Sequence, residues 1–108
     1  GGQLRMAGPN HYELVVVKSS KTVRENPIVV YVTDHAQNPL DVQGARGSAK
    51  LEAGKLKATS TLTPDGGNRM KGFAKYASTL GMTVEVTITL PGREAQTARF
   101  TPLGSATK

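Results

Sequence analysis

The stretch MTVEVTITL, residues 82–90, decides the fold class of this chain. Every second position in it is apolar: Met82, Val84, Val86, Ile88 and Leu90. The positions between them are polar: Thr83, Glu85, Thr87 and Thr89. This period of two, in a run rich in β-branched residues, is typical of a β-strand with one buried face. The turn PGR at 91–93 and the returning run EAQTARF at 94–100 predict a C-terminal hairpin.

Short strands separated by turn residues account for most of the remaining chain. The pattern predicts them at 11–18, 27–34, 48–54, 55–62 and, weakened by Gly72, 69–75. Between the last two lies the turn TPDGGN, where Pro64 fixes φ and the Gly residues accept positive φ. Seven or eight strands in a chain of this length predict an immunoglobulin-like antiparallel β-sandwich, with a small β-barrel as the alternative. We expect one domain over residues 1–101 and a flexible tail over 102–108.

The composition excludes several classes of function. The 108-residue chain has no cysteine, which excludes disulfides, thiolate metal sites and a cysteine nucleophile, and no apolar run approaches the length of a membrane span. Its formal net charge is +6, from 14 Lys and Arg against 8 Asp and Glu. These cations are spread along the sequence without the interleaved aromatic residues of a base-stacking platform, which argues against a nucleic-acid partner. They predict a solvated sheet face, with an acidic protein or an anionic surface as the alternative.

Nucleophilic catalysis finds little support in the residue set. His11 and His35 are the two histidines, and His35 directly follows Asp34. Neighbouring residues of an extended chain point apart, so Asp34 cannot orient His35 as a catalytic triad requires. The chain has no nucleophile elbow, and its acids are scattered rather than paired. We therefore do not expect an enzyme.

Metal binding is the chemistry that the residue set supports better. The candidate ligands are two imidazoles and two thioethers: His11, His35, Met6 and Met70. Together these groups suit a soft ion such as Cu(I) or Ag(I), with another transition metal as the alternative. A calcium site would require a local cluster of acids, and a structural zinc site would require four nitrogen or sulfur ligands.

Each candidate ligand also has a purely structural interpretation. Met70 fits a core position on its strand, as the third methionine, Met82, does on its own. Met6 fits an exposed position before the first strand, His11 fits a strand end, and His35 fits an exposed turn. A metal site therefore requires the loops at one end of the fold to bring Met6, His11 and His35 together.

Most of the chain resembles a known family. The similar stretches are GGQLRMAGPNHYELVVV at 1–17, PIVVYVTDHAQNPLDVQGARGSAKLEAG at 27–54 and LTPDGGNRMKGFAKYASTLGMTVEVTITLPG at 62–92. The motifs within them are Gly1-Gly2, Tyr12-Glu13-Leu14-Val15, Val30-Tyr31-Val32-Thr33-Asp34-His35 and Asn38-Pro39-Leu40. They resemble a small bacterial periplasmic domain of heavy-metal efflux systems, which occurs alone or as the N-terminal module of efflux-adaptor proteins. The chain is also similar to secreted immunoglobulin-like domains of the YtkA/FixH type.

This resemblance implies a periplasmic accessory domain of a metal-efflux or resistance system, with pump components or other envelope proteins as partners. A secreted domain is made with a signal peptide, and a start at Gly1-Gly2 rather than Met fits a removed signal peptide, a longer parent protein or a cloning decision. The expected ligand pool for Cu(I) or Ag(I) is His11, His35, Met6 and Met70. The alternative is a structural or protein-interaction module of a cell-envelope assembly without its own metal. That alternative rests on the sheet face that carries Lys50, Lys55 and Lys57, or on an exposed edge strand.

Overall fold

The computed structural model describes residues 2–103, and within them the protein is an all-β structure of eight antiparallel strands. The strands are β1 (Gln3–Ala7), β2 (Asn10–Val16), β3 (Arg24–Asp34), β4 (Arg46–Ala53), β5 (Leu56–Pro64), β6 (Arg69–Tyr76), β7 (Thr83–Thr89) and β8 (Gln96–Phe100). None of the described residues belongs to a helix that could cross a bilayer. The expected all-β class is therefore confirmed.

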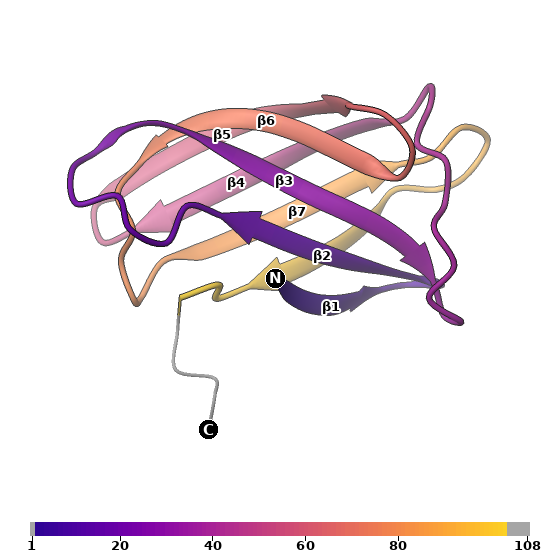
Figure 1. The fold of residues 1–108 in the computed structure, drawn as a ribbon, viewed down its shortest axis with the longest axis horizontal. Helices are drawn as coiled ribbons and strands as arrows, with labels where there is room; N and C mark the ends of the chain where they lie inside the picture. The colour runs from indigo at the N-terminus through magenta and orange to yellow at the C-terminus, as the bar shows by residue number, and fades with distance from the viewer. Residues whose placement is uncertain (1, 104–108) are drawn as a thin grey trace.

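The strands form two layers that are almost closed into a barrel (Figure 1). Their hydrogen-bonded order is β1-β2-β3-β6-β5-β4-β7-β8. Strand β5 pairs with β4 along most of its length but with β6 only at Thr63 and Pro64, so the boundary between the two layers lies between β5 and β6. This arrangement is compatible with both the predicted sandwich and the alternative of a small barrel.

The two edge strands, β1 and β8, are joined by a side chain. The Gln3 carboxamide donates from Nε2 to the Thr101 carbonyl oxygen at 3.2 Å and accepts from the Thr101 N–H at 2.8 Å. The carboxamide thus makes the pair of hydrogen bonds that a strand residue would make. The two edge strands therefore approach each other at this contact.

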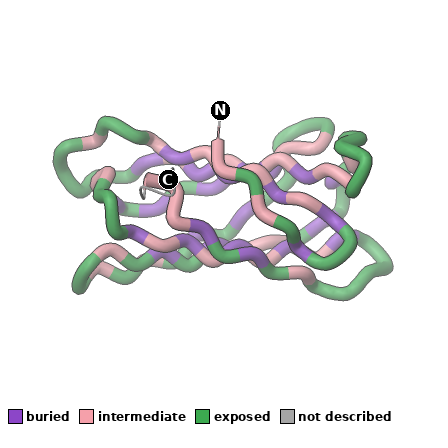
Figure 2. Tube along the Cα trace, turned by 90° about the horizontal axis from the view of Figure 1, so that it is seen from below, coloured by how far each residue is buried: buried purple, intermediate pink, exposed green. Residues whose placement is uncertain are grey.

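The core fills the space between the layers and follows the alternation of the strands (Figure 2). Its largest fully buried side chains are Tyr12, Tyr76, Phe100, Leu14, Ile28, Leu51, Leu62, Met70, Met82, Ile88, Val30 and Val32. The predicted core position of Met82 is confirmed. In β2 every second residue is fully buried and the others are half-buried, so this strand has one core face and one outer face.

Two buried tyrosines make hydrogen bonds through their hydroxyl groups; Tyr12 joins the two layers, and Tyr76 ties together strands of a single layer. Tyr12 donates to the Gln96 carbonyl oxygen at 3.1 Å and, at the longer distance of 3.4 Å, to that of Ile88. Tyr76 donates to the Pro27 carbonyl oxygen at 2.6 Å and accepts from the backbone N–H that follows β2. Burial raises the pKa of Tyr12 to about 12, although the hydrogen bond to Ile88 acts in the opposite direction.

Strand β1 differs from the sequence-based expectation, which placed Met6 before the first strand. Residues 3–7 pair with β2, and the two strands are joined by the two-residue turn Gly8-Pro9, with Gly8 at a φ of 59°. Glycine at the first central position is what a type II′ hairpin turn requires. The outer side chains of β1 are exposed and apolar, so the strand lacks the alternation that marks a half-buried strand.

The C-terminal segment is partly described. Leu103, which lies within the expected tail of residues 102–108, packs against the core. Residues 104–108 of that expected tail lie outside the described part of the chain.

Gly72 has a packing role in β6. A Cβ atom at this position would collide with the Ser60 hydroxyl and with the Thr61 carbonyl oxygen of β5. Gly72 is buried, and its backbone lies against β5, the strand that pairs with the start of β6. Glycine here permits a close approach of two backbones, which is the usual reason for a glycine inside a strand.

The role of Tyr12 predicts a loss of stability at high pH. The pKa of Tyr12 is higher in the folded protein than in the unfolded chain, so the folded state favours the neutral phenol. The resulting contribution to stability is complete below pH 10, the ordinary pKa of tyrosine, and is lost between pH 10 and about 12. We expect Tyr12→Phe to lower the free energy of unfolding by about 1 kcal/mol at pH 7 and to flatten its decline above pH 10. Urea unfolding at several pH values measures both effects, and an unchanged stability of the variant would contradict the role.

The role of Gly72 predicts that Gly72→Ala destabilises the fold by roughly 1–3 kcal/mol, because the added methyl group collides with backbone. Gly81→Ala is the matched control, since a Cβ there meets no atom within 4 Å. Thermal unfolding of both variants should show a lower Tm for the first alone. Equal Tm values would refute the close approach of β5 and β6.

Candidate metal site

Three of the four predicted ligands lie at one end of the β1-β2-β3 sheet. Met6 and His11 are directly opposed in the β1–β2 pairing, and side chains at opposed positions project from the same face of a sheet. His11 is opposed on its other side to Thr33 of β3, and His35 follows Thr33 by two residues. His35 lies in the turn directly beyond the end of β3, and its ring contacts that of His11 on the outer face.

The two imidazole rings are in contact. Their centroids lie 5.1 Å apart with an interplanar angle of 29°, which is a stacked arrangement. His11 Nδ1 is buried and has no hydrogen-bond partner. A buried nitrogen without a partner costs about 1–3 kcal/mol, so it marks a position where a bound group would stabilise the protein.

His35 is oriented by the β1–β2 turn. Its Nε2 lies 3.3 Å from the Gly8 carbonyl oxygen, and a carbonyl can only accept, so Nε2 carries the proton of this hydrogen bond. The lone pair of a neutral His35 is then on Nδ1. Histidines that bind metals usually donate their other N–H in this way, which fixes the ring and raises its basicity.

An Asx turn holds the His35 loop in place. The Asp34 carboxylate accepts from the backbone N–H groups of Ala36 and Asn38, each at 2.9 Å, and from the Asn38 side chain at 3.3 Å. The hydrogen bonds from Asn38, above all that of its N–H, together with the one from Ala36, hold the pKa of Asp34 below its ordinary value of 3.8. Gln37 takes a positive φ of 68° within the same turn.

The methionines differ sharply in exposure. The Met6 side chain is 62% exposed, whereas Met70 is fully buried and lies in the core, where its strand neighbours are Val30 and Pro64. Met70 therefore does not share the outer face of His11. The cluster that we call the Met6–His site consists of Met6, His11 and His35.

The donor set of the Met6–His site fits a soft ion better than a hard one. Within residues 2–103, no three His, Cys, Asp or Glu side chains are grouped as a hard or borderline metal requires. One thioether and two imidazoles offer sulfur and nitrogen donors, which favour Cu(I). Cu(I) and Ag(I) accept two or three ligands, whereas structural zinc sites need four.

Comparison with family models, curated proteins and solved structures gives no match. The chemistry of the site therefore rests on its own geometry.

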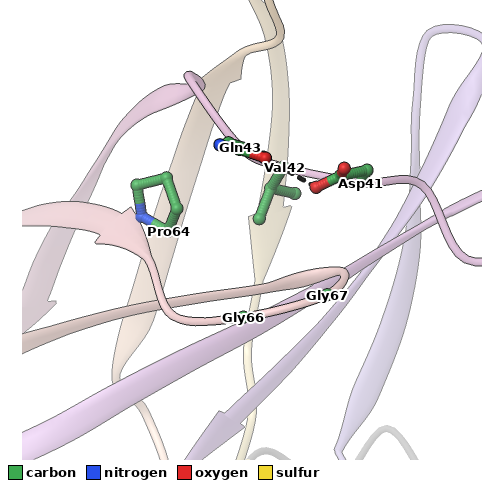
Figure 3. A pocket seen from close by; sticks show the side chains of 6 residues that line it. All are labelled: Asp41, Val42, Gln43, Pro64, Gly66 and Gly67. Atoms are coloured by element: carbon green, nitrogen blue, oxygen red, sulfur yellow. Dashed lines mark hydrogen bonds between the residues drawn. The ribbon is translucent and has the colours of Figure 1, made fainter.

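A hollow of about 250 Å³ lies elsewhere, between the β3–β4 connection and the β5–β6 turn (Figure 3). Its one titratable side chain is Asp41, whose carboxylate accepts from the Gln43 N–H at 2.9 Å. The floor is formed by Val42, whose N–H donates to the Gly67 carbonyl oxygen. Asp41 is thus engaged in a local turn, and no second charged group converges on the hollow.

The Asx turn predicts how the two rings respond to mutation. We expect Asp34→Ala to release the His35 loop at pH 7, so that the ring-current shift and the nuclear Overhauser contacts between His11 and His35 are lost. Asp41→Ala, which removes the equivalent turn at the hollow, is the control and should leave them unchanged. In the parent chain the Asx turn itself should hold above pH 3.8 and weaken as the pH falls further, because the lowered pKa of Asp34 keeps its carboxylate ionised above that value.

Proposed function

We propose that this chain is a non-catalytic domain that binds Cu(I) or Ag(I) through Met6, His11 and His35, as an accessory domain of a periplasmic heavy-metal efflux system. The observation that carries the binding proposal is the Met6–His11 cross-strand pair with the His35 ring stacked on His11. The unpartnered His11 Nδ1 supports it further, since a coordinated ion would satisfy that nitrogen. The efflux assignment rests on the resemblance of the sequence.

Each ligand has a distinct part in this proposal. Met6 would supply a soft sulfur donor from the exposed edge strand, where an ion can reach it from solvent. His11 would supply the buried nitrogen from the rigid strand β2. His35 would supply the nitrogen of the loop, with its orientation set by Gly8. When bound, the ion ties β1, β2 and the β3–β4 connection together.

The domain offers no thiol for this purpose, and this fits an oxidising compartment. A site built from thioether and imidazole does not lose its ligands to disulfide formation, whereas cysteine thiolates are readily oxidised outside the cytosol. The absence of cysteine from the sequence therefore agrees with a periplasmic role for a soft-metal site.

The proposal predicts the outcome of an Ag(I) titration followed by NMR. Ag(I) stands in for Cu(I) because it needs no reducing agent. We expect the His11 and His35 imidazole signals and the Met6 methyl signal to shift together and to saturate at one equivalent. Met6→Leu and His35→Ala should each weaken binding by at least about tenfold.

Met70→Leu is the matched control, since its thioether is in the core, and it should bind Ag(I) as the parent does. Zn(II) should bind more weakly than Ag(I), because the site has too few hard donors. No shift of the three side chains at a several-fold excess of Ag(I) would overturn the proposal, as would an equal effect of Met70→Leu and Met6→Leu.

A second candidate function is a protein-interaction module, which the outer face of the β1-β2-β3-β6 layer favours. Leu4 and Phe73 are large apolar side chains that are exposed on this face, and Phe73 lies under the Lys71 ammonium at 5.3 Å from the ring centre. Replacing His11 and His35 together separates the two candidates. It abolishes Ag(I) uptake under the first and leaves partner binding intact under the second.

A further inference from the structure

The positive charge of the protein is concentrated at one end. The loops 17–23, 54–55 and 77–82 meet at the end of the barrel opposite the Met6–His site, on the left of Figure 1. We call these loops, together with the residues within two positions of them along the chain, the basic end. Its cations are Lys18, Lys21, Arg24, Lys55, Lys57 and Lys75. Its acids are Glu25 and Glu52.

The other end of the barrel has the opposite balance. Its cations are Arg46, Arg69 and Arg93, and its acids are Asp34, Asp41, Asp65 and Glu94. Arg69 is neutralised by Asp65 at 2.7 Å. The net charge of +6 is therefore distributed unevenly along the long axis of the molecule, with an excess of cations at the basic end and an excess of acids at the other.

The basic end also carries two of the most exposed apolar side chains. Leu80 is 75% exposed and Val23 is 57% exposed. Both lie on loops, at the tip of the molecule rather than on a sheet face. Val23 lies between Lys21 and Arg24 in the sequence, so an exposed apolar side chain stands among cations at this end.

Hydrogen bonds join the two loops that carry these side chains. Ser78 donates its N–H to the Ser20 carbonyl oxygen at 2.8 Å, and the Ser20 N–H donates to Ser78 Oγ at 2.9 Å. The Asn26 side chain then joins Ser20 Oγ to the Tyr76 carbonyl oxygen, at 3.0 and 2.8 Å. The loops 17–23 and 77–82 thus form one platform anchored to the ends of β3 and β6.

We infer that the basic end docks onto an anionic lipid bilayer. Lysine and arginine near such a surface each strengthen binding by roughly fivefold at physiological salt. Leu80 and Val23 supply the apolar groups that enter the boundary between headgroups and acyl chains. In this arrangement the cations would contact the anionic headgroups, and the exposed apolar side chains would reach the acyl chains beneath them.

The shape and composition of the basic end disfavour other anionic partners. The loops 17–23, 54–55 and 77–82 contain no Phe, Tyr or Trp, so they offer no platform on which bases stack. Leu80 and Val23 are largely exposed on these loops, whereas a groove for an acidic peptide would bury the side chains that line it. The hollow beside Asp41 and Pro64 lies at the opposite end.

The test is sedimentation of the full chain with vesicles at 0.1 M salt, comparing phosphatidylcholine alone with phosphatidylcholine containing 30% phosphatidylglycerol. We expect at least about tenfold tighter binding to the anionic vesicles, with most of it lost at 0.5 M salt. Lys21→Glu with Lys55→Glu should weaken this binding by at least about 25-fold, since it removes two cations and adds two anions. Arg46→Glu with Arg93→Glu changes the net charge equally at the other end and should change binding less than about threefold.

Leu80→Ser tests the apolar contact and should weaken binding several-fold at constant charge, while its circular dichroism and Tm confirm that it folds. Equal losses in the two charge-reversed variants would overturn the proposal, because binding would then follow net charge alone. Equal binding to both vesicle types would also overturn it. Binding of soluble polyaspartate without binding of vesicles would overturn it in favour of an acidic protein partner.

Discussion

The register of β2 between β1 and β3 is the constraint on which the rest of this structure depends. Successive residues of a strand face opposite sides, so a shift by one position would exchange the core face for the outer face. The buried Tyr12 prevents that shift, because its hydroxyl reaches the Ile88 and Gln96 carbonyl oxygens across the core. With Tyr12 inside, His11 must face outward, opposite Met6 and beside the loop that carries His35.

Alternation in the sequence predicts most of the fold, and MTVEVTITL at 82–90 shows why. Its apolar positions line a single core face in β7, and the pattern needs no knowledge of the partner strands. Strand β1 carries no such alternation because its outward residues, Leu4 and Met6, are apolar and exposed, so polarity does not reveal its faces. The Gly8-Pro9 turn between two short runs was the signal that could have found it.

The candidate site could be predicted as a list of residue types but not as an arrangement. Met6 faces His11 only because β1 is a strand, and His11 touches His35 only because β2 and β3 pair with Thr33 opposite His11. Met70 has the same chemistry as Met6, and its position in the core separates it from the site. The basic end escaped prediction for the same reason, since its cations are scattered in sequence and only the topology collects them.

The two proposals place their surfaces at opposite ends of the same strands. Strand β2 begins beside the Met6–His site and ends beside the loop 17–23 of the basic end. A domain seated on a bilayer by its basic end would therefore present Met6, His11 and His35 away from the lipid, toward an incoming ion or a soluble donor. This geometry makes the proposals compatible, while each is tested without the other.

X-ray absorption at the copper edge, on the chain loaded with one equivalent of Cu(I), tests the central claim most directly. We expect a first shell of one sulfur and two imidazole nitrogens, and loss of the sulfur contribution in Met6→Leu. A shell of nitrogen and oxygen only, or one with two sulfur atoms, would contradict the assignment of Met6, His11 and His35 as the ligands.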